Sequence, residues 1–170
     1  MADWVDGVVG QWERERPDLT EALGPIEVLM RIQRLNRVLD RELKAFFTAH
    51  DLEVGEFDVM ASLRRAGPPF TLTAGAFLKV SLVTSGAITN RLDRMEAKGL
   101  VERVRDGCDR RTVHIRLTER GRRLTDRVLG AHLDNYARLL EPLEAGEREQ
   151  LATALRKLLE AHGDTTPPED

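Results

Sequence analysis

The sequence is poor in the features that secreted, membrane-spanning or disulfide-stabilised proteins require. Its 170 residues include a single cysteine, Cys108, which excludes an intrachain disulfide. No apolar run approaches the roughly 18 residues that are needed to cross a bilayer. Residues 1–10 carry Asp3 and Asp6 and lack the basic start and the apolar stretch of a signal peptide. We therefore expect a cytoplasmic protein that has no contact with a membrane.

Signs of catalysis are equally scarce. The glycines form no nucleotide-binding loop between a strand and a helix, and no serine lies in a nucleophile elbow. The four histidines are scattered without the spacing of metal ligands: His50, His114, His132 and His162. We therefore expect neither an enzyme nor a bound metal or cofactor.

By contrast, the sequence contains many apolar residues at regular intervals. Hydrophobic residues make up 41% and charged residues 32%, whereas aromatic residues make up only 5%. These proportions are typical of a single helix-rich unit whose core is built from Leu, Val and Ile. The segment 163–170 is polar and contains two prolines, so we expect it to be disordered.

Apolar spacing predicts most of the helices. A short helix is expected within residues 7–23, around Val8 and Trp12, with an interruption near Pro17. A long helix is predicted over 25–49, because apolar residues recur there at intervals of three and four: Val28, Ile32, Leu35, Leu39, Leu43 and Phe46. Further helices are predicted over 55–66, within 71–80 behind a Thr73 cap, over 85–98 between Thr84 and Gly99, over 118–140 and over 144–162.

Two short stretches change the period. Residues 100–105 and 112–117 are rich in Val, Ile and Thr, and the second alternates apolar with polar side chains. The polar segment 106–111 lies between them and contains a glycine, so the three segments predict a β-hairpin. A helix–turn–helix that is followed directly by such a hairpin is a winged helix–turn–helix. The fold class is therefore mainly α, with a small hairpin wing.

Charge is distributed unevenly along the chain. The net charge is −3, yet residues 84–123 contain eleven Lys or Arg against six Asp or Glu, a local charge of +5. The rest of the chain holds fifteen basic and twenty-three acidic residues, a charge of −8. Because phosphate binding depends on the local field, this basic segment is a candidate nucleic-acid surface.

The predicted helix over 85–98 offers a face for reading bases. Ile88, Leu92 and Met95 share the buried stripe, which leaves Asn90 and Arg94 opposite it. Asn pairs bidentately with adenine and Arg with guanine in the major groove. The alternative is an ordinary solvated face. With the wing arginines included, the expected DNA-binding residues are Thr84, Ser85, Thr89, Asn90, Arg94, Lys98, Arg105, Arg110 and Arg111. A charged turn that only keeps the hairpin soluble is the alternative for the wing.

The stretch TSGAITNRLDRMEAKGLVERVRDGCDRRTVHIRLTERG, residues 84–121, closely resembles the recognition helix and wing of the MarR family. The resemblance extends over nearly the whole chain. It implies a homodimer in which N- and C-terminal helices interdigitate, so that 1–50 and 119–162 serve dimerisation and 51–118 binds DNA. Two recognition helices and two wings then address a pseudo-palindromic operator.

One subgroup, the urate-responsive regulators with an extra N-terminal helix, carries a switch that this chain resembles. The matching residues are Trp12 in QWERERPDL, Asp58 in GEFDVMASLRRAG, Arg91 in TNRLDR and Arg103 in GLVER. An Arg91–Asp58 ion pair would hold the recognition helix ready for DNA. A planar anion would then take over Arg91 and stack on Trp12.

Each of these residues has a plainer interpretation. Asp58 suits a helix N-terminus, Arg91 a phosphate clamp and Trp12 a packing anchor. The expected function is a ligand-responsive repressor that is released from DNA by a small anion such as urate. The alternatives are redox sensing through Cys108, beside Arg110 and Arg111, and a winged-helix binding protein that needs no ligand.

Overall fold

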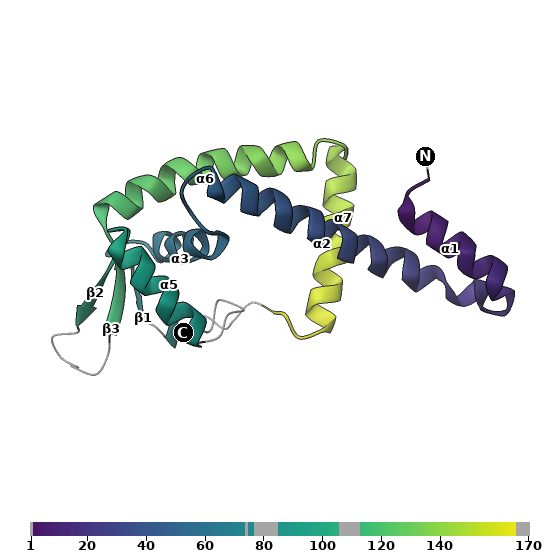
Figure 1. Cartoon of the computed structure of the whole chain (residues 1–170), viewed down its shortest axis with the longest axis horizontal. Coiled ribbons are helices and arrows are strands. Elements are labelled where there is room, and N and C mark those ends of the chain that lie inside the picture. The colour runs from purple at the N-terminus through teal and green to yellow at the C-terminus, as the bar shows by residue number, and fades with distance from the viewer. Residues whose placement is uncertain (1, 74, 77–84, 106–112, 166–170) are drawn as a thin grey trace.

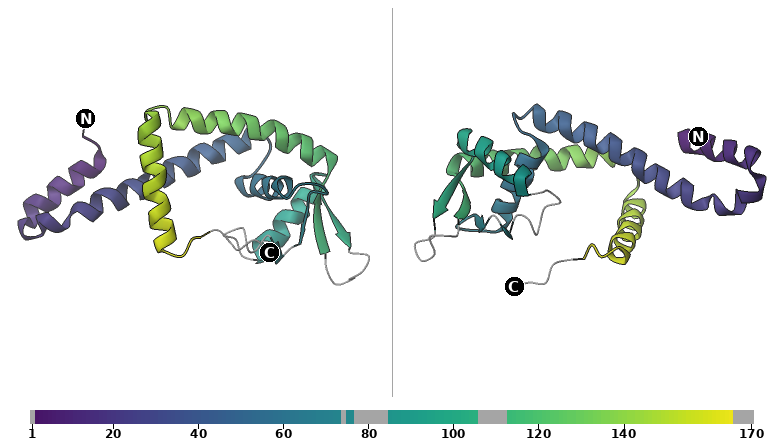
Figure 2. Two further views of the ribbon diagram at one scale, coloured as in Figure 1. Left: turned by 180° about the vertical axis from the view of Figure 1, so that it is seen from behind. Right: turned by 60° about the horizontal axis from the view of Figure 1, so that its bottom comes forward.

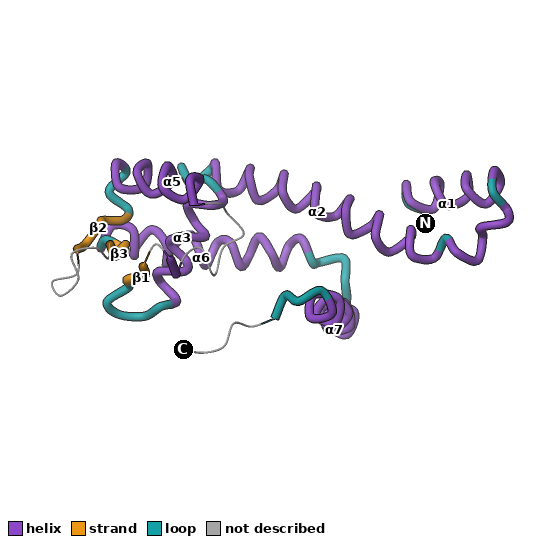
Figure 3. The backbone as a smooth tube through the Cα atoms, turned by 90° about the horizontal axis from the view of Figure 1, so that it is seen from below, coloured by secondary structure: helices purple, strands orange, loops and turns teal. Residues whose placement is uncertain are grey.

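The computed structural model describes residues 2–73, 75–76, 85–105 and 113–165, without the side chains of 85–87. Helix α1 (Trp4–Glu15) lies at one end of the molecule and a three-stranded sheet at the other (Figure 1). Views from behind and from below keep this separation (Figures 2 and 3). The long helix α2 (Gly24–Thr48) extends from α1 toward the sheet end.

The first helix folds back along α2. Asp3 caps α1 by accepting hydrogen bonds from the amides of Val5 and Asp6, at 2.8 and 3.0 Å. A 3-10 turn, η1 (Pro17–Ala22), then reverses the chain, which confirms the interruption predicted near Pro17. Val5 and Val9 are the buried residues of α1, whereas Trp12 on the expected apolar face is 47% exposed.

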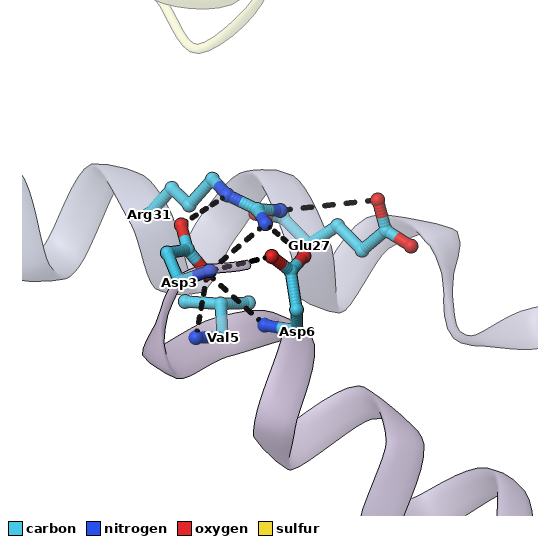
Figure 4. A network of polar contacts seen from close by, with 5 residues as sticks. All are labelled: Asp3, Val5, Asp6, Glu27 and Arg31. Carbon is cyan, nitrogen blue, oxygen red and sulfur yellow. Dashed lines mark hydrogen bonds and ion pairs between the residues drawn. The ribbon is translucent and has the colours of Figure 1, made fainter. Parts of the chain in front are cut away.

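Arg31 fixes the position of α1 on α2. Its Nε lies 2.8 Å from Asp3 and its Nη2 lies 2.5 Å from Asp6, and Glu27 lies one helical turn away at 3.8 Å (Figure 4). The cap residue Asp3 is therefore also an ion-pair partner. Because all four side chains reach solvent, this network orients α1 more than it stabilises the fold.

Helix α2 confirms the predicted long helix but buries little of its stripe. Phe47 at the C-terminal end is the buried residue of α2, and Leu43 and Phe46 pack partly against the same core. Val28 and Leu35 nearer the N-terminal end are 53% and 51% exposed. A single chain thus leaves the N-terminal part of the apolar face uncovered.

Helix α3 (Val54–Arg65) begins the winged unit and ends before Gly67, which has φ of +74°. Residues Thr71–Thr73, up to the predicted cap, then form strand β1, which the sequence did not predict. The Ala76 amide donates to Thr73 Oγ1 at 3.1 Å, as expected of a cap at Thr73. Residue 74 and residues 77–80 of that predicted range lie outside the described residues.

Helix α5 (Ser85–Ala97) ends before Gly99, whose φ of +67° is the left-handed conformation expected there. Strands β2 (Val101–Arg105) and β3 (Val113–Leu117) pair antiparallel and confirm the hairpin. Strand β1 pairs with the other edge of β3, giving the order β1-β3-β2. The sheet therefore has one strand more than predicted.

The core lies between α3, α5 and the sheet. Met60, Leu63 and Met95 are fully buried, and Leu100 and Ile115 are almost so. Together with the three-stranded sheet, these residues give a mainly helical winged helix–turn–helix, as the sequence predicted.

Helix α6 (Glu119–Leu139) begins at Thr118, whose Oγ1 accepts the Gly121 amide at 3.0 Å, and a turn near Pro142 leads to α7 (Ala145–Ala161). Helix α7 stands away from the sheet end, and all of its residues are exposed (Figure 2). None of the helices among the described residues has the length and apolarity of a membrane span.

Candidate nucleic-acid interface and effector site

Helix α5 is oriented as its sequence predicts. Ile88, Leu92 and Met95 are at most 4% exposed and face the core. Thr89 and Asn90 are exposed on the other side. The helix therefore presents a hydroxyl and an amide, two groups that can hydrogen-bond to base edges in a major groove.

Two basic residues of α5 are engaged by the start of α3. Arg94 Nη2 lies 2.8 Å from Glu53 Oε2, and half of its side chain stays exposed. Lys98 Nζ lies 3.0 Å from Glu56 Oε2 and 3.0 Å from the Asp51 carbonyl oxygen. Since Glu56 is completely buried, Lys98 compensates an interior charge. Its ammonium is turned toward the protein body in this structure.

Glu56 has a second role, which was not predicted from the sequence. The Oε2 atom that receives Lys98 also accepts the Glu53 amide at 2.9 Å, so Glu56 caps its own helix. The sequence contains a signal for this role, because a glutamate three residues after the cap position is half of a capping box. Neither the burial of Glu56 nor its pairing with Lys98, 42 positions away, can be predicted from the local sequence.

Arg103 joins the wing to α5. Its guanidinium lies 2.6 Å from Asp93 and also binds Glu96, and its amide donates to Glu96 at 3.2 Å. Because one arginine binds both acidic residues of α5, it offsets their repulsion of phosphate. Asp93 and Glu96 were not singled out from the sequence. Arg103 itself was expected in the effector site, and the structure places it at the contact of α5 with β2.

Arg105 ends β2 and is exposed. The remaining expected wing and turn contacts cannot be placed. Thr84, Arg110 and Arg111 lie outside the described residues, as do the side chain of Ser85 and Cys108 with its expected redox role.

Asp58 on α3 and Arg91 on α5 are brought together, as the effector hypothesis requires. The neighbouring helices partly desolvate the Asp58 carboxyl and raise its pKa above 3.8, while Arg91, Arg65 and His132 act in the opposite direction. The expected direct ion pair is not formed between these two described residues; the attraction acts over a longer distance. Arg91 Nε is buried and has no hydrogen-bond partner within the described chain.

Gly55 accommodates the Arg91 guanidinium. A Cβ at position 55 would lie 2.2 Å from Arg91 Cζ, so only glycine permits this contact. Gly55 also lines a cavity of about 560 Å³ between α2 and the start of α3. The opposite wall is formed by Asp40, Leu43 and Lys44 of α2. Arg91 is not part of the lining, but its guanidinium contacts Gly55, which is. The cavity is large enough for a small planar anion.

Trp12 does not join this site within one chain. It lies on α1, which contacts α2 and η1 at the far end of the molecule from α3 and α5 (Figure 3). The structure therefore brings together two of the four expected effector residues, Asp58 and Arg91. Trp12 and Arg103 lie elsewhere.

A helix–turn–helix unit that is followed by a β-hairpin wing defines the class of winged helix–turn–helix regulators. In this chain the wing also binds the polar face of α5. The MarR family model matches residues 50–112. The HTH-type transcriptional regulator PecS of Dickeya dadantii is 34% identical over 154 residues, covering 91% of this chain and 92% of PecS. The chain belongs to the MarR family of transcriptional regulators.

A further relative agrees in sequence and in structure. The multiple antibiotic resistance protein MarR of Escherichia coli is 32% identical over 131 residues, which cover 75% of this chain and 88% of that protein. The crystal structure of a mutant E. coli MarR complexed with operator DNA superposes with a TM-score of 0.68 and 30% identity. That match covers 87% of this chain and 97% of the other.

Proposed function

We propose that the protein is a homodimeric repressor that binds a pseudo-palindromic operator through α5 and the wing and leaves it when a small anion binds beside Arg91. The observation that carries the DNA-binding part is the exposed Thr89 and Asn90 face on a helix whose two acidic residues are bound by Arg103. A mutant of one relative, MarR of E. coli, was crystallised with operator DNA.

Uncovered apolar surface supports the dimer. Helix α7 has no buried residue, yet Leu151, Leu155 and Leu158 recur on one side of it, and α2 leaves Val28 and Leu35 exposed. A lone amphipathic helix of this length is unstable in water unless another surface covers its apolar face. A second copy of the chain supplies such a surface with the same composition.

The DNA-binding proposal is tested with Asn90→Ala on a duplex from the region flanking the protein's own gene. We expect the variant to lose about 1–3 kcal/mol of binding free energy and to discriminate less between operator and scrambled duplexes. Gln11→Ala on α1 removes another exposed amide far from α5 and serves as the control. Unchanged operator preference in Asn90→Ala would show that this face does not read bases.

The effector proposal rests on three features at and near the cavity beside Gly55, which we call the effector cleft. Arg91 has a buried Nε without a partner, Asp58 lies near it without a direct ion pair, and the cavity beside Gly55 is open. A planar anion can bind the guanidinium bidentately and prefer a displaced position of α5. We propose urate as the first candidate. Trp12 would take part only from a second copy of the chain.

Titration of the protein–operator complex tests the effector. Urate, xanthine, citrate and salicylate are compared at equal ionic strength, with operator release and tryptophan fluorescence as the two readouts. We expect release by at least one of these anions, and at least tenfold weaker release in Arg91→Gln. Arg156→Gln removes the same charge from exposed α7 and is the control. A complex that persists with every anion at millimolar concentration would indicate a ligand-independent binder.

A further inference from the structure

A second cavity of about 350 Å³ lies on another side of the winged unit. One wall is the α2–α3 turn, with His50 and Asp51, and another is the C-terminal end of α5, with Lys98. The third wall is a face of α6. The effector cleft beside Gly55 has a different lining, so the two cavities are separate.

The α6 wall concentrates positive charge. Arg120, Arg123 and Arg127 are spaced by three and four residues, which places them on one side of the helix, and all three line the cavity. Arg123 has a long ion pair with Glu119 at 3.8 Å. Arg120 and Arg127 have no ion-pair partner in the described part of the chain. Like-charged neighbours at this spacing repel one another, so an anion between them relieves that repulsion.

The other walls add little negative charge. Lys98 Nζ is held by Glu56 and by the Asp51 carbonyl oxygen, so its charge is already balanced. The carboxylate of Asp51 is the acidic side chain in the lining. His50 donates from Nδ1 to the Phe46 carbonyl oxygen at 2.8 Å, which leaves Nε2 for another partner. The cavity therefore has an excess of about two positive charges, counted from three arginines and one aspartate.

We propose that this cavity binds a small phosphorylated molecule with at least two adjacent phosphate groups, at a site separate from the effector cleft. Planar guanidinium groups match phosphate oxygens bidentately, and three of them on one wall suit a diphosphate better than a single charge. Because the walls belong to the end of the recognition helix and to α6, the occupied site braces α5 against α6. The binding event is independent of the proposed effector.

The test uses the full-length protein without DNA and inorganic pyrophosphate as the probe. Calorimetry at physiological ionic strength should show saturable binding with one pyrophosphate per chain. The double variant Arg120→Gln/Arg127→Gln should weaken it at least tenfold, and Arg127→Gln alone by less. The control Arg14→Gln/Arg156→Gln removes two exposed charges on α1 and α7 and should leave binding unchanged.

Three results would overturn the site. They are the absence of saturable binding, equal weakening by the control pair, and full binding by the double variant. A fourth comparison distinguishes a site for a free phosphorylated ligand from a contact with the phosphates of the DNA backbone. If the double variant loses only salt-sensitive DNA affinity, while wild type does not bind pyrophosphate, then these arginines contact the duplex and the proposal fails. Urate-dependent operator release is measured separately, so this outcome leaves the proposed function intact.

Discussion

Individual side chains of α5 combine exposed polar groups with attachment to the protein body. Its apolar residues and its exposed Thr89 and Asn90 lie where helical spacing predicts them. The partners of its charged residues could not be predicted, because Glu53 and Glu56 are 41 and 42 positions from Arg94 and Lys98. Periodicity indicates which way a side chain faces, whereas long-range ion pairs depend on how the elements pack.

Gly55→Ala should displace the Arg91 guanidinium without changing its charge. The added Cβ would overlap the Arg91 guanidinium, which is the mobile end of a side chain, so the guanidinium must move while the fold persists. We expect equal or higher stability, since alanine favours a helix by about 1 kcal/mol over glycine. Release of operator by the effector should weaken several-fold.

Gly146→Ala is the matched control, because nothing lies within 4 Å of its added Cβ and it also occupies a first helical turn. Both variants are compared by thermal melting and by effector titration. Equal effector responses in the two variants would show that the guanidinium position beside Gly55 is unimportant.

His132 should make stability depend on pH. Its ring packs among Phe46, Phe47 and Tyr136, and this burial lowers its pKa below 6.5, while Asp58 acts in the opposite direction. The unfolded chain therefore binds a proton more readily than the folded chain. Stability is retained above pH 6.5 and is lost as the pH falls from there through the lowered folded-state pKa.

Denaturant unfolding from pH 8 to 5 measures this effect against His132→Gln, which cannot titrate. As the pH falls, the free energy of unfolding of wild type should decrease relative to that of the variant. A constant difference would mean that His132 has the same proton affinity in both states.

Secondary-structure elements that depend on local pattern were predicted well, and those that depend on distant pairing were not. Helices α2, α3, α5, α6 and α7 and the β2–β3 hairpin lie within a residue or two of the predicted ranges. Strand β1 was missed because three residues are too short to show alternation. It forms through pairing with residues 114–116, more than forty positions away.

The N-terminal end of α6 is fixed by a close backbone contact. A Cβ at Gly121 would lie 2.1 Å from the Leu100 carbonyl oxygen and 3.0 Å from Leu117 Cδ1. We expect Gly121→Ala to destabilise the protein by about 1–3 kcal/mol, because the obstructing atom belongs to the backbone and cannot rotate away. Chemical denaturation gives the free energy of unfolding.

Gly130→Ala in the same helix has open space around the added Cβ and should stabilise by up to about 1 kcal/mol. The two variants share the helix propensity gain, so their difference reports the contact with Leu100. Equal stability would show that α6 can shift without cost.

At the scale of the whole molecule, one chain leaves much of its apolar surface uncovered. The winged end has its own core, whereas α7 and the N-terminal part of α2 expose their apolar residues. The sequence predicted these stripes without indicating which would find a partner inside the chain. The position of α1 was also beyond prediction, since it depends on the bonds from Arg31 to Asp3 and Asp6.

Leu155→Glu should dissociate the proposed dimer. The side chain is 37% exposed in one chain and lies on the leucine face of α7, where a buried carboxylate would lack a partner. Sedimentation velocity should show a monomer, and operator affinity should fall with it. Thr153→Glu places the same charge on the opposite face of α7 and should remain dimeric. A dimeric Leu155→Glu protein would place the interface elsewhere.

The shared carboxylate of Glu56 constrains how the molecule can change state. One oxygen of this completely buried carboxylate serves both the first turn of α3 and Lys98, which directly follows α5. Withdrawing Lys98 alone would strand a charge there, at about 3–5 kcal/mol. Small displacements of α5 are therefore resisted, and we expect gene control by this protein to be abrupt, with few half-released intermediates.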